Sequence, residues 1–343
     1  MNCLPEAANR PKGAEWHHMA HRLILQLSPR THLRLVKEAL SGTAKARRRH
    51  AKQTATPASV EAGLSAIARR WPSLASPQTS EPIFILSAGW RCGSTFLQRW
   101  LMKGNDLLIW GEPYRYSEPI HLLARQVCAF AKEDWPSVSF FEDQYPDQTD
   151  LTNEFVANLY PSMEEFLGAH LAYFERLFVA PAARFNRARW GLKEVSLTTD
   201  DACYLKWLFP NARFLFLYRS PYHAYRSYRQ WRDWYRSWPD EPIFTATSFG
   251  MWWRELTTDF VRNHQKVGGL LLPYETLRTP ETRKRLEDYL GMTIADPSGL
   301  PRVRNLVERD ASNDDNRWVP RVERFLLKRA IEPVGTELGY RHL

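Results

Sequence analysis

The chain has 343 residues, of which 44% are hydrophobic, enough for one large α/β domain with an appendage or for two small domains. No apolar run approaches the ~20 residues of a membrane-spanning helix, and residues 23–27 are too short an apolar run for a signal peptide. The net charge of +9 comes from residues 1–80, which hold 13 Lys and Arg residues and 4 Asp and Glu residues. The remainder of the chain holds 34 basic and 34 acidic residues and is neutral overall. Because the excess of basic residues belongs to the N-terminal part alone, no nucleic-acid partner is expected.

Residues 1–80 are predicted to form a basic, helical extension that ends in a linker. Apolar residues recur at helical spacing over 16–27, and Ser28-Pro29 suits the start of a second helix that ends near Gly42. Residues 45–52 are a basic run, and residues 54–79 have the Ala, Ser and Pro content of a linker. Two interpretations stay open: a solvated arm that packs on the domain, or an element that docks on an anionic membrane surface or a protein partner.

Residues 81–343 are predicted to form a single α/β domain. Short apolar runs predict strands at residues 83–86, 107–110, 189–192, 213–218 and 269–273. Helical spacing predicts helices at residues 96–101, 119–131, 163–178, 200–209, 222–238, 247–265 and 280–290. Such alternation favours a parallel sheet with helices on both faces. Residues 134–150 are interpreted as an irregular excursion, and His170 as a core residue.

The first candidate site lies between the strand at 83–86 and the helix that follows it. The intervening turn reads Gly89-Trp90-Arg91-Cys92-Gly93-Ser94-Thr95, and it aims backbone N–H groups and a helix N-terminus at one point, which favours an anion. It is not a Walker A loop, because its glycines are too close together and no Lys precedes Ser94. A cysteine phosphatase loop fits poorly too, because Gln98 stands where an Arg is needed.

A second candidate site follows the strand at 213–218. The strand runs into Arg219-Ser220-Pro221 and then into a helix that contains Ser227. Helical side chains lean toward the N-terminus, so the Ser227 hydroxyl and the Arg219 guanidinium could share an anion. The competing interpretation is a helix cap beside a surface Arg.

Four polar residues occupy the carboxyl ends of the predicted strands: Arg91, Glu112, Lys193 and Arg219. In parallel α/β sheets, ligands bind at this edge. The shared position therefore predicts a single site.

The two motifs together resemble those of the sulfotransferases that use 3′-phosphoadenylyl sulfate (PAPS). Five positions match that family's 5′-phosphosulfate loop one for one: Arg91, Gly93, Ser94, Thr95 and Phe96. The segment from Arg219 to Ser227 resembles its 3′-phosphate motif, in which Ser follows Arg by eight residues. The resemblance covers roughly residues 82–318 and is closer to soluble bacterial-type members than to membrane-anchored Golgi members.

The resemblance implies a P-loop-like, three-layer fold and sulfuryl transfer from PAPS to a hydroxyl acceptor, with release of PAP. The residues implied in PAPS binding are Arg91, Cys92, Gly93, Ser94, Thr95, Phe96, Arg219, Ser227 and, in a looser match, Arg317. Cys92 is expected to contribute only packing and its backbone, and the Tyr-Glu-x-Leu segment at 274–277 is interpreted as structural.

Three residues are the implied catalytic groups. Glu112 is the candidate base, Lys193 would approach the leaving group, and Arg91 would stabilise charge on the bridging oxygen. Plain ion pairs are the competing interpretation: Glu112 with Arg91 or Arg115, and Lys193 with Glu194 or Glu112.

The remaining expectations concern cofactors, partners and location. No metal is expected, because the sulfuryl group carries a single charge and no strand ends in a Walker B Asp. A carbohydrate or glycolipid acceptor is weakly favoured over another small molecule, since Trp90 and Trp110 near the site would suit stacking on sugar rings. Four scattered cysteines without a Cys-x-x-Cys pair indicate a cytoplasmic protein, with peripheral membrane attachment as an option. The alternative functions are an ATP-dependent P-loop kinase and an inactive nucleotide-binding protein that recruits an anionic partner.

Overall fold

The computed structural model describes residues 59–112, 119–131, 160–229, 243, 245–300 and 319–340. The predictions for residues 1–58, for the excursion at 134–150, for residues 230–238 and for Arg317 lie outside the described residues. The fold below is that of the described part of the chain.

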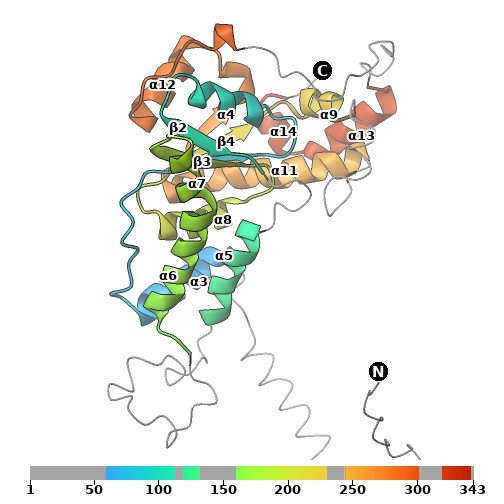
Figure 1. The fold of residues 1–343 in the computed structure, drawn as a ribbon. Coiled ribbons are helices and arrows are strands. Elements are labelled where there is room, and N and C mark those ends of the chain that lie inside the picture. The colour runs from blue at the N-terminus through green and yellow to red at the C-terminus, as the bar shows by residue number, and fades with distance from the viewer. Residues whose placement is uncertain are drawn as a thin grey trace, which may run out of the picture. The chain divides into compact units, whose positions relative to one another are not determined.

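A five-stranded parallel sheet forms the centre of the domain (Figure 1). Its strands are β1 (Ile83–Ser87), β2 (Leu107–Trp110), β3 (Arg189–Glu194), β4 (Arg213–Tyr218) and β5 (Leu270–Pro273). Their order is β2-β3-β1-β4-β5, so the strand that leads into the first motif is central, and the strand of the second motif is its neighbour. The predicted P-loop-like α/β fold is confirmed.

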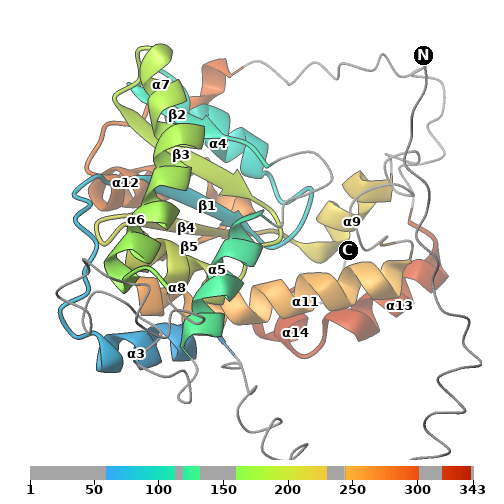
Figure 2. The same ribbon diagram turned by 60° about the horizontal axis from the view of Figure 1, so that its bottom comes forward.

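Side chains that alternate along β1 and β4 divide the core into two layers. Ile83 and Ile85 point to a layer formed by α4 (Ser94–Met102) and α12 (Pro280–Leu290), whereas Phe84 and Leu86 point to the opposite layer. That opposite layer contains α5 (Pro119–Phe130), α6 (Met163–Phe174), α8 (Thr199–Leu208) and part of α11 (Ala246–Asn263) (Figures 1 and 2). Buried His170, whose Nδ1 lies 2.6 Å from the Tyr204 hydroxyl, is part of this core, as expected.

Short helical elements complete the two layers. They are η3 (Glu175–Val179), α7 (Ala180–Arg184), η4 (His264–Val267), η5 (Tyr274–Thr276) and η6 (Pro297–Gly299). Thr279 caps α12, because its hydroxyl accepts a hydrogen bond from the Thr282 N–H at the start of the helix.

A helical cluster at one end of the sheet was not fully predicted. It joins α9 (Pro221–Arg229) and α11 to two helices that the sequence patterns did not reveal, α13 (Arg321–Ile331) and α14 (Val334–Glu337). A Cβ atom at Gly250 of α11 would lie 2.7 Å from the Ala330 Cβ, so the absence of a side chain lets α13 approach α11 closely.

Part of the predicted linker is a helix, so the linker prediction is wrong there. Helix α3 (Val60–Arg70) buries Val60 and Ile67 in the main core. Both Asp200 carboxylate oxygens accept hydrogen bonds from backbone N–H groups of its first turn, at Val60 (2.6 Å) and Glu61 (2.9 Å). The Ala-rich composition that resembles a linker also favours a helix, and tertiary packing decides between the two.

Candidate functional site

The loop between β1 and α4 is held in a conformation that its glycines permit. Gly89, Arg91 and Gly93 have φ angles of 91°, 65° and 93°, in the left-handed region. A Cβ atom at Gly93 would lie 2.1 Å from the Tyr274 ring, so this position excludes any side chain. The close approach of Tyr274 to Gly93 joins the β1–α4 loop to the segment after β5.

Helix α4 begins at this loop without a side-chain cap. Gly93 is its N-cap residue, buried Ser94 is its first residue, and the exposed Thr95 follows. Backbone N–H groups at an uncapped helix start carry partial positive charge and favour an anion. The predicted phosphosulfate residues thus lie at a helix start whose backbone N–H groups favour an anion.

Cys92 has the packing role that was expected of it. Its thiol is fully buried and lies 3.2 Å from the Ala88 carbonyl oxygen, to which it donates a hydrogen bond. Burial raises the pKa of the thiol to about 12, so it stays protonated at neutral pH and is unsuited to act as a nucleophile.

The two predicted anion-binding motifs meet in the structure. The Arg91 Nε donates a hydrogen bond of 2.9 Å to the Ser227 hydroxyl, although the two residues are 136 positions apart. The Arg219 guanidinium donates a hydrogen bond of 3.0 Å to the Arg91 carbonyl oxygen. Ser227 was expected to act beside Arg219, but its described side-chain partner is Arg91 of the β1–α4 loop.

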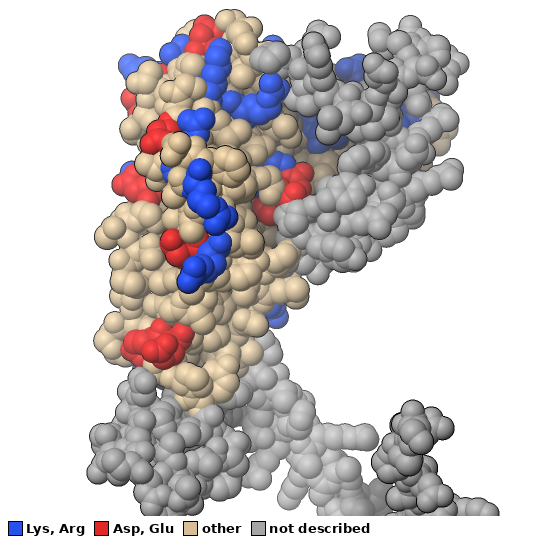
Figure 3. Space-filling model, in the orientation of Figure 1, with Lys and Arg blue, Asp and Glu red and all other residues tan. Residues whose placement is uncertain are grey.

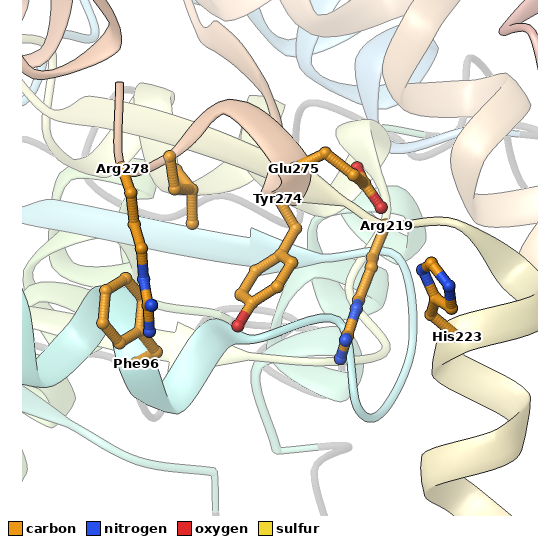
Figure 4. A pocket seen from close by; sticks show the side chains of 7 residues that line it. Phe96, Arg219, His223, Tyr274, Glu275 and Arg278 are labelled. Atoms are coloured by element: carbon orange, nitrogen blue, oxygen red, sulfur yellow. The ribbon is translucent and has the colours of Figure 1, made fainter. Parts of the chain in front are cut away.

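A cavity of about 280 Å³ opens beside these motifs, and Figure 4 shows the side chains that surround it. Its lining residues are Phe96, Arg219, His223, Tyr274, Glu275, Leu277 and Arg278. The Arg219 guanidinium lies 4.4 Å from the centre of the Tyr274 ring, and the Arg278 guanidinium lies 4.9 Å from that of Phe96. The cavity thus combines aromatic faces with cations.

The charged groups of this cavity are not equally available to a ligand. The Glu275 carboxylate already accepts hydrogen bonds from the Ser220 N–H (2.8 Å) and the Tyr340 hydroxyl (3.0 Å). In contrast, the buried Arg219 Nε has no hydrogen-bond partner within the described part of the chain. A buried donor of this kind favours an acceptor supplied by a ligand.

Lys193 and Glu112 form an ion pair at the carboxyl ends of β3 and β2. The two side chains are only 5% and 17% exposed, so the pair is shielded from solvent. Lys193 is in register with Ile85 of β1, whereas Glu194 is in register with Leu86, whose side chain points to the opposite layer. Lys193 therefore has Glu112 as its partner, one of the two carboxylates that the sequence left open.

Burial changes the proton affinity of both residues at the end of β3. It lowers the pKa of Lys193 to about 8, although the neighbouring Glu194 acts in the opposite direction. It raises the pKa of Glu194 to about 8, against the effect of Lys193. Both groups therefore change charge close to the physiological range.

Several residues of this region were not predicted as site residues. His223, Glu275 and Arg278 line the cavity with Tyr274, and the Tyr-Glu-x-Leu segment was the available signal, although it was interpreted as structural. At the start of α8, the buried Asp201 lies 2.8 Å from the Nδ1 of His121, which belongs to α5. Only the tertiary fold brings His121 there, so no local signal identified it.

The prediction that Trp90 stacks on a sugar ring is wrong. It is buried, stacks on Tyr228 with ring centroids 5.7 Å apart, and lies 4.1 Å from the Trp252 ring centroid. Trp110 is half-buried, donates a hydrogen bond of 3.0 Å to the Phe178 carbonyl, and contacts the exposed Phe185 edge-on. Of the two tryptophans, only Trp110 keeps a surface that an acceptor could reach.

Comparison with known proteins identifies the family. A family model described as "Sulfotransferase family" matches residues 82–296, more than half of the chain. The chain belongs to the sulfotransferase family. The matched residues include both motifs and the Glu112–Lys193 pair, so sulfuryl transfer is the expected chemistry of this site. A search of curated proteins finds no match.

Solved bacterial sulfotransferases are among the structural neighbours of the chain. The sulfotransferase from Alicyclobacillus acidocaldarius is 15% identical, with 77% of this chain and 98% of that chain covered and a TM-score of 0.41. The sulfotransferase domain from the Synechococcus PCC 7002 olefin synthase is 20% identical, with 65% and 78% covered and a TM-score of 0.35. Family membership rests on the family model.

Proposed function

We propose that the protein transfers a sulfuryl group from PAPS to a hydroxyl acceptor and releases PAP. The observation that carries this proposal is the contact between the two anion-binding motifs, in which Arg219 holds the Arg91 backbone and Arg91 holds Ser227. PAPS has anionic groups at both ends of its nucleoside, and two adjoining anion sites match that requirement. A kinase would instead need a loop lysine that this chain lacks.

The residues around the cavity fit PAPS. The uncapped start of α4, with Ser94 and Thr95, would hold the phosphosulfate. Arg219, whose buried Nε is available as a donor, would hold the 3′-phosphate together with Ser227. Phe96 and Tyr274 would supply aromatic faces for the nucleobase.

The Glu112–Lys193 pair is suited to the proton and charge movements of the transfer. PAPS supplies the sulfuryl group, whose bond to the phosphate oxygen breaks as the bond to the acceptor oxygen forms. Glu112 accepts the acceptor's hydroxyl proton, which makes the oxygen a better nucleophile. Lys193 and Arg91 donate hydrogen bonds to the departing phosphate oxygens and stabilise their developing charge.

Activity is expected to fall as the pH rises above about 8, because Lys193 then loses the proton with which it stabilises the leaving group. The Lys193→Arg variant keeps its charge and should lose this alkaline limb, whatever its maximal rate. The check is a pH–rate profile of both proteins at saturating substrate. An alkaline limb at the same pH in both proteins would assign it to another group, such as Glu194.

Above about pH 8, where activity is expected to fall, the contribution of Lys193 to the free energy of unfolding should rise. The pKa of Lys193 is lower in the folded chain than its ordinary value of 10.5, so the unfolded chain binds more protons between about pH 8 and that value. The contribution of Lys193 to the free energy of unfolding therefore increases with pH in this window. Thermal melting over the same pH series separates loss of activity from loss of fold.

Calorimetric titration with PAP tests the donor assignment, with 5′-AMP and Mg-ATP as comparison ligands. Charge-assisted hydrogen bonds contribute about 1.5–3 kcal/mol each, so PAP should bind at least about tenfold more tightly than 5′-AMP. Equal affinity for PAP and 5′-AMP would contradict the two-anion assignment. Tighter binding of Mg-ATP would favour the kinase alternative.

The acceptor is proposed to be a hydroxyl compound, with a carbohydrate or glycolipid favoured. The support is the half-buried Trp110, two residues before Glu112, whose ring lies edge-on to the exposed Phe185. A half-buried aromatic ring with an exposed aromatic neighbour suits the apolar face of a sugar ring.

A further inference from the structure

Helix α13 presents an outward face that is both apolar and cationic. Val322, Phe325 and Leu326 are 69%, 64% and 38% exposed, although each is a large hydrophobic residue. Three exposed basic residues share this outward side of the helix: Arg321, Lys328 and Arg329. The helical period places Phe325 at its centre, with basic residues to either side.

The orientation of this face is fixed by the packing of the opposite side. Leu327, Ala330 and Ile331 are buried, and all three side chains pack around Gly250 of α11. Figures 1 and 2 show α13 along the end of α11, at the edge of the domain remote from α3. The exposed apolar side chains are therefore presented by an anchored helix.

The single acidic residue of α13 does not contribute to the outward face. Glu323 accepts a hydrogen bond of 2.9 Å from the Tyr225 hydroxyl, and its carboxylate lies 2.9 Å from the Arg229 Nε. Both partners belong to α9, the helix that carries Ser227. The outward face is thus left with cations and apolar groups, whereas the face shown in Figure 3 intersperses basic with acidic side chains.

We propose that the α13 face docks on an anionic lipid bilayer. Exposed Phe, Val and Leu side chains enter the headgroup boundary, and flanking Lys and Arg contact lipid phosphates. Charge complementarity favours this occupant: a nucleic acid would use the cations but leave the apolar centre without a role. Docking would also set α9 close to the bilayer, because Glu323 connects the two helices. Among the helices that the structure describes, none has the length and apolarity to cross a membrane.

Flotation of the full chain with vesicles tests the proposal, using phosphatidylcholine alone and phosphatidylcholine mixed with phosphatidylglycerol. The wild type should float with the anionic vesicles only. The Val322→Ser/Phe325→Ser variant should bind about tenfold more weakly, because it loses the apolar contact. The Lys328→Gln/Arg329→Gln variant should lose about fivefold in affinity for each charge removed.

Matched controls separate this face from the basic residues 1–80, which are unchanged in every variant. Leu122→Ser removes a residue that is 58% exposed on α5, and Lys284→Gln/Arg285→Gln removes two exposed charges on α12. Neither should change vesicle binding. Hydrogen exchange with anionic vesicles should show added protection over residues 321–329.

Three results would overturn the proposal. One is a wild type that does not float with anionic vesicles. The second is an α13 variant set that floats like the wild type, which would assign binding to another part of the chain. The third is loss of binding in the charge variant but not in the apolar variant, because this would indicate an electrostatic partner rather than insertion into a bilayer.

Discussion

The Glu112→Gln variant is expected to transfer the sulfuryl group about 10²- to 10⁴-fold more slowly than the wild type. Glutamine has the size of glutamate and can still accept a hydrogen bond from Lys193, but it cannot take the acceptor's proton. The loss should appear in kcat, measured as PAP release with PAPS and a hydroxyl acceptor obtained by screening. PAP affinity should change little, because the proposed donor site lies at Arg219 and the start of α4.

The matched control for this variant is Glu255→Gln, which changes an exposed carboxylate on α11 and should leave kcat unaltered. Thermal melting shows whether loss of the buried charge pair alters the fold. Near-normal turnover by Glu112→Gln would remove Glu112 as the base. His121, held by buried Asp201 at the start of α8, would then be the next residue to test.

The Arg219→Ala variant should lose affinity for PAP by about tenfold or more, because a charge-assisted hydrogen bond contributes about 1.5–3 kcal/mol. Its guanidinium has a buried Nε available to a phosphate, whereas another of its nitrogens supports the Arg91 carbonyl. The loss should be smaller for 5′-AMP, which lacks the 3′-phosphate. Calorimetric titration of both ligands measures the difference.

Two further variants test whether the loss of PAP affinity comes from the contact between Arg219 and the 3′-phosphate. Arg285→Ala removes an exposed cation from α12 and should leave PAP affinity unchanged. Arg219→Lys keeps the charge but not the planar fork, so it should recover only part of the affinity. Equal losses for PAP and 5′-AMP in Arg219→Ala would indicate that the residue supports the β1–α4 loop rather than the 3′-phosphate.

The positions of most strands and helices could be predicted because their signals are local. The run Arg213–Tyr218 is apolar enough to be a buried strand in any arrangement, and Thr279-Pro280 is a strong helix start. Helices α3 and α13 have weaker signals. Their burial depends on contacts with distant residues, such as Asp200 for α3 and Gly250 for α13, so sequence composition alone was misleading or silent.

The residues at the carboxyl ends of the strands could be identified from the sequence, because apolar strands and the glycine turns that end them are local patterns. The sequence therefore located Arg91, Glu112, Lys193 and Arg219 in one region of a parallel sheet. Their partners could not be identified in this way, since strand order and register bring together side chains that are far apart in the chain. That is why Arg91 contacts Ser227, and why Lys193 pairs with Glu112 while its neighbour Glu194 points into the opposite layer.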